Sequence, residues 1–184
     1  MTRNQTRDYG PAPELTVSKW LNTQEDLTLE KLRGKVVVIE AFQMLCPGCV
    51  SHGLPQAKTV SQMFSRERVA VIGLHSVFEH HDAMTETSLA AFLYEYGISF
   101  PVAIDMPGTQ AIPKTMEAYG LQGTPSLILI DINGNRRAQF FGQIHDLQLG
   151  AEIAFLLADS SKLHATTLEA ASDKTMCTGN GCPV

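Results

Sequence analysis

The sequence is short of charge, of long apolar runs and of cysteine. Charged residues make up 18% of its 184 residues, and 14 Lys and Arg against 19 Asp and Glu give a net charge of −5. An acidic balance without basic clusters offers no electrostatic basis for binding nucleic acid or a membrane surface. No run of about 18 apolar residues occurs, so the sequence predicts no transmembrane helix.

The N-terminal stretch, MTRNQTRDYGPAPEL, has basic residues but no apolar segment of signal-peptide length behind them. As written, the sequence therefore predicts a cytoplasmic protein. If a leader was removed ahead of this Met, the expected location is the periplasm instead.

The four cysteines come as two close pairs, Cys46 with Cys49 and Cys177 with Cys182. In a reducing compartment such pairs are more often catalytic or metal-binding than structural. Hydrophobic residues at 44% supply the core of one domain. The cysteine pairs are therefore the most informative residues in the chain.

Buried strands and helices are expected to alternate along the chain, which indicates an α/β fold with a parallel central sheet and right-handed crossovers. Strands are expected at 36–42, 68–78 and 100–106, with helices at 49–66 and 85–97 between them. A short helix at 114–120, a hairpin turning at Asn133-Gly134-Asn135, and a last helix at 146–159 should follow. Residues 1–12 are predicted to form an N-terminal arm, 13–158 the domain, and 159–184 a polar tail.

The motif Cys46-Pro47-Gly48-Cys49 lies where a buried strand ends and a helix is expected to begin. Free amide N–H groups and the positive end of the dipole at a helix N-terminus favour a thiolate over a thiol. Only the thiolate attacks disulfides. Pro47 suits the first helical turn, and Cys49, about one turn later, is close enough to resolve a mixed disulfide. The motif therefore predicts a redox dithiol with Cys46 as the attacking thiolate.

Two further positions fit this chemistry. Glu40 lies in the otherwise apolar strand, where a carboxylate is costly unless it is paired or protonated. A raised pKa would let Glu40 accept the proton of Cys49 as that thiol attacks; the alternative is a Glu at an exposed strand end. Thr124-Pro125 begins another apolar strand, which suggests a special turn, with a cis bond as one possibility.

The segments EAFQMLCPGCVSHGLP, FPVAID and YGLQGTPSLILIDINGN together resemble the thioredoxin superfamily, and most of all its redoxin branch with the TlpA and ResA type oxidoreductases. The resemblance covers about residues 13–158 and implies a thioredoxin-like fold, a central mixed sheet flanked by helices. It implies a cis Thr124-Pro125 peptide that aligns the substrate backbone, and it places the family's buried acid at Glu40.

The resemblance implies that the protein is a thiol-disulfide oxidoreductase that needs no cofactor. Its partners would be protein disulfides and an upstream thiol reductant. The family usually has Trp where Leu45 stands, and the Pro-Gly dipeptide matches neither thioredoxin nor the strong oxidants. Because that dipeptide influences redox poise, the preferred direction of electron flow stays open.

The second pair, Cys177 and Cys182, forms a CxxxxC motif in the predicted tail. Two glycines in the intervening loop would let it close into a disulfide without much backbone strain. One interpretation is a mobile second redox pair that exchanges with Cys46 and Cys49. The other is a small local disulfide or two idle thiols, and the sequence favours neither.

Three other functions are compatible with parts of the sequence. All four cysteines could bind zinc tetrahedrally, although such a site needs neither Glu40 nor the Thr-Pro turn. A copper carrier would combine the dithiol with a distant His such as His80 or His81, but the carriers of this fold space their cysteines by three residues. A thiol peroxidase is disfavoured, because Ile39 and Gln43 stand where that class has Pro and a hydroxyl residue.

Overall fold

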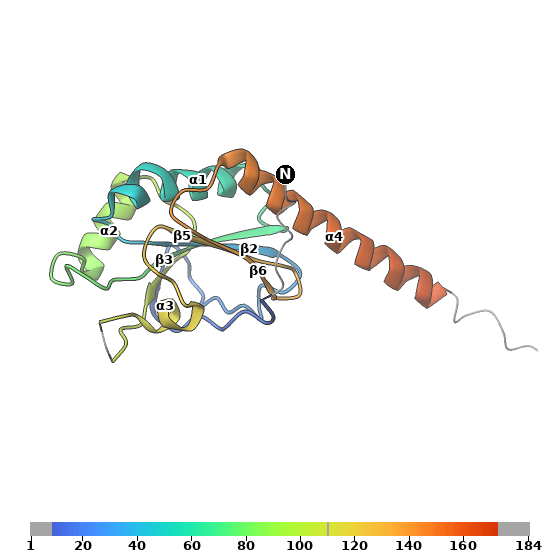
Figure 1. Ribbon diagram of the computed structural model, residues 1–184, viewed down its shortest axis with the longest axis horizontal. Helices are drawn as coiled ribbons and strands as arrows, with labels where there is room; N and C mark the ends of the chain where they lie inside the picture. The colour runs from blue at the N-terminus through green and yellow to red at the C-terminus, as the bar shows by residue number, and fades with distance from the viewer. Residues whose placement is uncertain (1–8, 110, 173–184) are drawn as a thin grey trace, which may run out of the picture.

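Six strands form one mixed sheet in the order β1-β4-β3-β2-β5-β6. The strands are β1 (Val17–Leu21), β2 (Val36–Phe42), β3 (Val69–His75), β4 (Val102–Asp105), β5 (Ser126–Ile130) and β6 (Arg136–Phe141). The structure, a computed structural model, describes residues 9–109 and 111–172 (Figure 1). β2, β3 and β4 run parallel, whereas β1, β5 and β6 are antiparallel to their neighbours. The predicted mixed sheet is therefore present, with the hairpin at one side.

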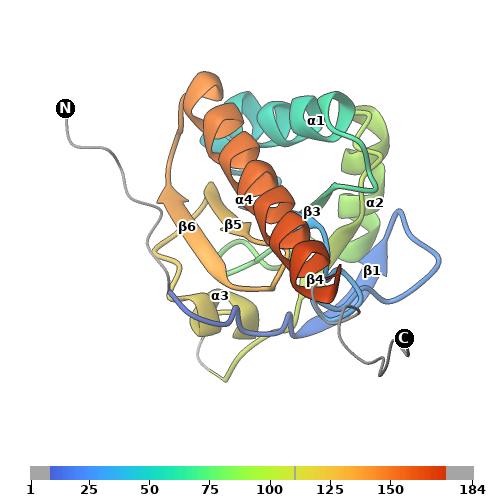
Figure 2. The ribbon, with the colours of Figure 1, turned by 90° about the vertical axis from the view of Figure 1, so that its right-hand side faces the viewer.

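Helices cover both faces of this sheet (Figures 1 and 2). They are the π-helical turn η1 (Cys49–Gly53), α1 (Leu54–Met63), α2 (Glu86–Glu95), α3 (Lys114–Tyr119) and α4 (Asp146–Ser172). One core lies between the sheet and α1, α2 and α4; the other lies under α3 and the chain that precedes β2. Successive side chains of β2 point into alternate cores, and all seven are buried. That double burial explains its almost wholly apolar sequence.

The local signals set several of the element ends. The Thr85 side chain accepts a hydrogen bond from the Ser88 N–H at 3.2 Å and caps α2. Gly120, in the left-handed region with φ of 61°, ends α3. In the β5–β6 turn the Asp131 carboxylate accepts from the N–H groups of Asn133 and Asn135, each at 2.9 Å. The predicted hairpin is therefore closed by its Asn-Gly turn.

The predicted helix 49–66 is interrupted and ends earlier than expected. A π-helical turn, η1, comes first, and α1 then runs from Leu54 to Met63 with Pro55 in its first turn. Pro55 has no N–H for an intrahelical bond, and in the first turn of α1 that loss costs nothing. The interruption of the predicted helix thus lies at the junction between η1 and α1.

The two ends of the predicted domain also differ from the structure. Residues 9–12 belong to the fold rather than to a separate arm: the Tyr9 N–H donates to Arg136 at 3.0 Å and the Arg136 N–H donates to Gly10 at 2.9 Å. Helix α4 continues to Ser172, well past the predicted end at 159. Residues 160–172 contain Ala, Leu, Lys and Glu and neither Gly nor Pro, so nothing in them stops a helix. Within the described ranges no helix combines the length and apolarity needed to cross a bilayer.

Candidate functional site

Cys46 lies just beyond the end of β2 and directly before the first helical residue, Pro47. Its carbonyl accepts the Val50 N–H at 3.1 Å, the first bond of the helical ladder. Its sulfur accepts the Cys49 N–H at 3.2 Å. This is the geometry of a helix N-cap, with Sγ in the place of the usual Ser or Asp oxygen. The structure therefore places Cys46 at a helix start, as the sequence predicts.

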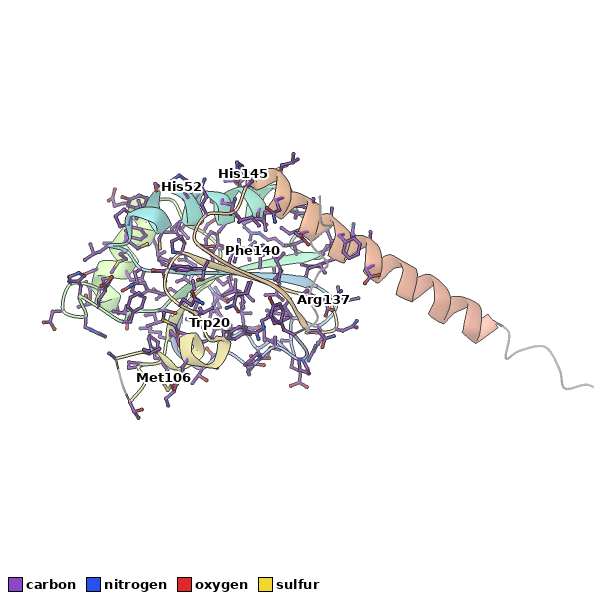
Figure 3. The ribbon with its side chains drawn as sticks, in the orientation of Figure 1. Trp20, His52, Met106, Arg137, Phe140 and His145 are labelled. Carbon is purple, nitrogen blue, oxygen red and sulfur yellow. The ribbon has the colours of Figure 1, made fainter. Side chains whose placement is uncertain are left out.

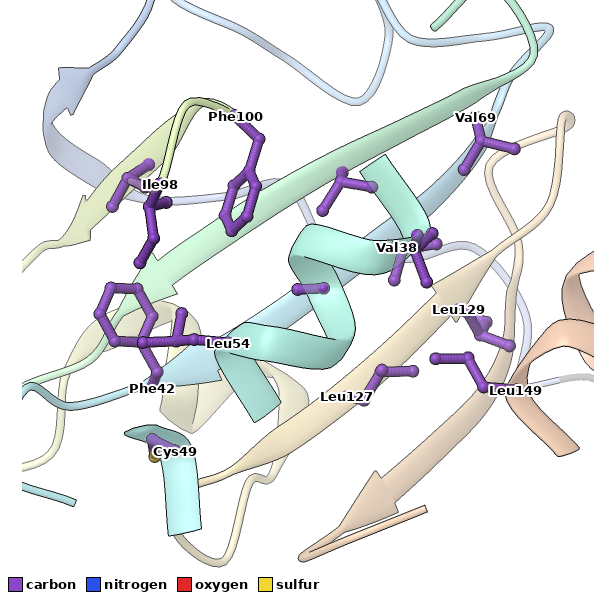
Figure 4. Close-up of a cluster of buried hydrophobic side chains, with 14 of the residues drawn as sticks. Val38, Phe42, Cys49, Leu54, Val69, Ile98, Phe100, Leu127, Leu129 and Leu149 are labelled. Atoms are coloured by element: carbon purple, nitrogen blue, oxygen red, sulfur yellow. The ribbon is translucent and has the colours of Figure 1, made fainter. Parts of the chain in front are cut away.

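The two sulfurs of the motif have different surroundings. Cys46 is half-buried and Cys49 is fully buried, and both are thiols. Figure 4 shows Cys49 at the edge of the apolar cluster that contains Phe42 and Leu54. Burial, together with the hydrogen bond with Cys46, raises the pKa of the Cys49 thiol to about 12. Cys46 is accessible to a partner, whereas Cys49 is shielded and holds its proton firmly.

The Thr124-Pro125 peptide is cis and lies against the dithiol. The Cys46 thiol donates to the Thr124 carbonyl at 3.5 Å, across 78 residues of sequence. A hydrogen bond from the Thr124 side chain lowers the pKa of Cys49, but by less than burial raises it. The structure thus brings Thr124 and Pro125 to both cysteines.

Glu40 lies in the middle of β2 and is 1% exposed. Its Oε1 has no hydrogen-bond partner among the described residues. Burial raises the pKa of the Glu40 carboxyl well above its usual range, and the charge of Cys46 raises it further. The exposed strand end considered for this residue is therefore wrong, and Glu40 is a buried acid on the dithiol side of the sheet.

Gly53, the last residue of η1, leaves the space that Glu40 fills. A Cβ built on Gly53 would overlap Oε1 of Glu40 and would lie 3.1 Å from Cβ of Pro125. Any larger residue would displace either the carboxyl or the cis-proline. The sequence analysis missed this glycine; the available signal was a Gly inside a helical pattern, which often marks a close approach.

Two other buried polar side chains near β2 were also missed. Gln43 is 1% exposed, and its Oε1 has no partner among the described residues. His75, at the end of β3, is equally buried, with its ring centroid 5.2 Å from that of Phe42. Burial lowers the pKa of His75 to about 4, so its ring is neutral in the fold. A His after an apolar strand gave no sequence signal of this burial.

The positions proposed for metal binding are not brought together in the described structure. His80 and His81 are exposed in the loop before α2, whereas Cys49 is buried. Nowhere in ranges 9–109 and 111–172 do three or more His, Cys, Asp or Glu side chains gather as metal ligands. Cys177 and Cys182 lie outside the described residues.

The comparison with family models decides the classification. The model described as Redoxin matches residues 9–151. The chain belongs to the Redoxin family. Its matched segment begins at Tyr9, in agreement with the pairing of residues 9–12 with the β6 end of the sheet.

Individual relatives agree with this family. A thioredoxin-like superfamily protein of known structure is 61% identical, with a TM-score of 0.79 over 80% of this chain and 96% of that one. A thiol-disulfide isomerase from Corynebacterium glutamicum is 55% identical, with a TM-score of 0.78 over 81% and 97% of the two chains. Protein DipZ of Mycobacterium bovis is 31% identical over 142 residues, 76% of this chain and 19% of DipZ.

The chain therefore spans about a fifth of the length of the DipZ proteins that it matches. The similarities confirm the predicted thioredoxin-like fold and the predicted redoxin branch. They also agree with the predicted enzyme class, a thioredoxin-like thiol-disulfide oxidoreductase.

Proposed function

We propose that this protein exchanges electrons with protein disulfides through Cys46 and Cys49. The observation that carries the proposal is the unequal environment of two adjacent sulfurs. One is half-buried and receives an amide N–H at 3.2 Å; the other is buried, with its pKa raised to about 12. A dithiol whose two sulfurs react one after the other needs such unequal surroundings. The first sulfur must be accessible to a substrate, and the second must stay unreactive until the mixed disulfide has formed.

The exchange begins when the Cys46 thiolate attacks one sulfur of a substrate disulfide. A Cys46–substrate bond forms, the substrate S–S bond breaks, and the other substrate sulfur leaves as a thiolate. The Cys49 N–H donates a hydrogen bond to the Cys46 sulfur, which lies at a helix N-terminus. Both features favour negative charge on this attacking sulfur. The Thr124 carbonyl, already 3.5 Å from that sulfur, marks where the substrate backbone passes.

The second step releases the product. Cys49 attacks the Cys46 sulfur, a Cys46–Cys49 bond forms, and the second substrate sulfur leaves as a thiolate that takes up a proton. Because the Cys49 thiol holds its proton firmly, the attack needs a base. We assign that role to Glu40, because its raised pKa makes its carboxylate a stronger base than an ordinary one and its Oε1 has no partner among the described residues. An upstream thiol reductant would then restore the dithiol.

The test uses a peptide with one disulfide and follows every species by intact mass. The reduced wild-type protein should reduce the peptide and acquire a Cys46–Cys49 disulfide in equal amounts. In a background with Cys177→Ser and Cys182→Ser, Cys49→Ser should stop at a one-to-one adduct on Cys46, and Cys46→Ser should yield neither product nor adduct. An adduct on Cys49 in the Cys46→Ser protein would refute the assignment of the two roles.

A second proposal concerns Cys177 and Cys182, which we propose as a relay that returns electrons to the dithiol. The length of α4 limits how such a relay could work. Asp146, its first residue, accepts from the Gln56 side chain of α1 at 2.5 Å, beside the dithiol helix. The 27 residues of α4 rise about 40 Å, and Figure 1 shows its far end projecting away from the sheet.

Cys177 lies five positions beyond Ser172, and a fully extended chain of that length spans at most about 18 Å. Exchange within one chain therefore requires the last turns of α4 to unwind, whereas exchange between two copies does not. We propose the exchange between copies. The test starts from Cys49→Ser protein in which Cys177 and Cys182 are joined as a disulfide. The Cys46 thiolate of one copy should attack that bond in another copy, so that a Cys46–Cys177 or Cys46–Cys182 bond forms as the Cys177–Cys182 bond breaks. These dimers should form at a rate that rises with protein concentration. A concentration-independent crosslink within one chain would contradict this route, and no crosslink would remove the relay.

A further inference from the structure

A polar cavity of about 220 Å³ opens between α3 and β6. Its walls include Tyr9, Tyr119, Ser126, Arg136 and Phe141. Arg136 is the one residue with a formal charge that lines it. The mechanism proposed above makes no use of this cavity.

The cavity adjoins the loop that touches the reactive sulfur. Ser126 directly follows the cis-proline, and the Phe141 ring packs on Gly123, where an added Cβ would lie 3.0 Å from the ring. The Gly142 N–H donates to the Pro125 carbonyl at 2.8 Å and holds the end of β6 to this loop. Thr124, whose carbonyl contacts Cys46, precedes Ser126 in the cavity wall by only two positions. A substrate joined to Cys46 can therefore place a nearby side chain in the cavity.

Arg136 is held in a fixed position at this cavity. Its guanidinium lies 4.7 Å from the centroid of the Tyr9 ring and 5.6 Å from that of Tyr119. Its Nη1 donates to the Tyr119 carbonyl and to Oε1 of Gln139, both at 3.0 Å. These contacts fix the plane of the guanidinium, which reduces the entropy lost when it binds a further group.

No carboxylate of residues 9–109 or 111–172 forms a salt bridge with Arg136. The salt bridges among the described residues are Lys19 with Glu86 and Arg137 with Asp131. The Nε of Arg136 is buried without an acceptor in the described part of the chain. A fixed, unpaired guanidinium in a polar cavity has the geometry and charge to bind a carboxylate.

We propose that this cavity is a subsite for an acidic side chain, Asp or Glu, that lies close to the reactive cysteine of a protein substrate. The inference rests on the proposed function, since it assumes a mixed disulfide at Cys46. It adds a preference among substrates: disulfides flanked by acidic residues react faster than otherwise identical neutral ones.

The experiment uses the Cys49→Ser protein and pairs of disulfide peptides that differ only in Glu or Gln at one, two or three residues from the cysteine. The rate of adduct formation on Cys46 is measured by mass spectrometry. For at least one position the Glu peptide should form the adduct about tenfold faster than the matching Gln peptide, because it gains one charge-assisted hydrogen bond. Arg136→Gln should bring that ratio close to one, and Arg137→Gln, the matched control on the neighbouring residue, should leave it unchanged.

A second variant guards against a folding defect in Arg136→Gln. Gln139→Glu keeps the arginine and its two tyrosines but puts a carboxylate beside Nη1, so it should abolish or invert the preference for Glu. A ratio near one at every position in the parent protein, or an equal ratio in all variants, overturns the subsite. If no peptide of either kind forms an adduct, the proposed function itself fails.

Discussion

Two of the buried carboxylates in the described structure, Glu40 and Asp105, have different surroundings. Asp105, at the end of β4, accepts hydrogen bonds from the Ser76 hydroxyl at 2.8 Å and from the N–H groups of Thr115 and Met116 at 2.8 and 3.0 Å. Glu40 leaves Oε1 without a partner among the described residues. Burial raises the pKa of both, but in Asp105 four hydrogen bonds lower it again in part. Asp105, whose oxygens are hydrogen-bonded, links β4 to neighbouring elements. Burying Glu40 with an unpaired oxygen is costly, and a role in proton transfer accounts for that cost.

The same difference appears at the two helix starts. Asp105 caps α3 with two carboxylate oxygens, and nothing in the exchange reaction disturbs them. Cys46 caps the dithiol helix with a sulfur, and that sulfur must form a bond to a substrate. One helix start is therefore permanent, whereas the other must exchange its partner during the reaction. Four substitutions test this comparison.

The largest effect is expected for Glu40→Gln. Loss of the base should slow release of the second substrate sulfur by about a hundredfold, while the attack by Cys46 keeps its rate. Rapid-quench mass spectrometry separates the two steps as formation and decay of the mixed disulfide. An unchanged decay rate would remove Glu40 from the mechanism.

Stability should respond to Glu40→Gln in the opposite direction. A raised pKa in the folded state means that ionisation of Glu40 destabilises the fold, so the wild-type protein loses stability as pH rises above the unfolded-state pKa of about 4.3. The amide does not ionise. The free energy of unfolding of Glu40→Gln, minus that of the wild type, should therefore increase from pH 4 to pH 8, as measured by urea denaturation.

Asp105→Ala should act on stability alone. It removes the cap of α3 and leaves the buried Ser76 hydroxyl without its acceptor, which together cost about 2 to 3 kcal/mol. The rates of attack and release, measured on the fraction that remains folded, should match those of the wild type. A changed release rate at full folding would show that the two helix starts are not independent.

His75 should make the dithiol face sensitive to acid. Its pKa is lowered to about 4 in the fold from about 6.5, so its contribution to stability is complete above pH 6.5 and is lost as pH falls toward 4. The wild type should lose about 2 kcal/mol relative to His75→Gln between pH 7 and pH 5. Denaturant titrations at both pH values check this, and parallel losses in the two proteins would contradict it.

The smallest effect is expected for Gly53→Ala. The added methyl displaces the Glu40 carboxyl, which should slow release about tenfold and cost about 1 kcal/mol. In a Glu40→Ala background the same change meets no carboxyl and should not slow release further. Gly150→Ala, where an added Cβ meets nothing within 4 Å, is the control. Equal effects in both backgrounds would show that Gly53 does not position Glu40.

The sequence predicted the parts of the fold that are encoded locally. A run of β-branched residues predicted β2, the Asn-Gly pair predicted the hairpin, and the CPGC motif was correctly placed at a helix start. Glu40 could be singled out because a carboxylate in an apolar strand is conspicuous. Each of these signals lies within a few residues of the feature that it predicts.

The remainder depends on contacts between distant segments. Nothing near Asp105 shows that the N-terminus of α3, ten residues later, folds back onto its carboxylate. The space for Glu40 at Gly53 exists only once η1 packs on β2 and Pro125. The contact of Arg136 with Tyr9 likewise joins residues that the sequence keeps far apart. Such features appear only when tertiary packing is known.

The most direct test of the proposed division between the two sulfurs is alkylation of the reduced protein, with each cysteine mapped by mass spectrometry across pH. We predict that iodoacetamide modifies Cys46 at pH 7 to 8, whereas Cys49 stays unmodified in the folded protein until the pH approaches 12. Equal modification of the two cysteines at neutral pH in the folded protein would contradict the account.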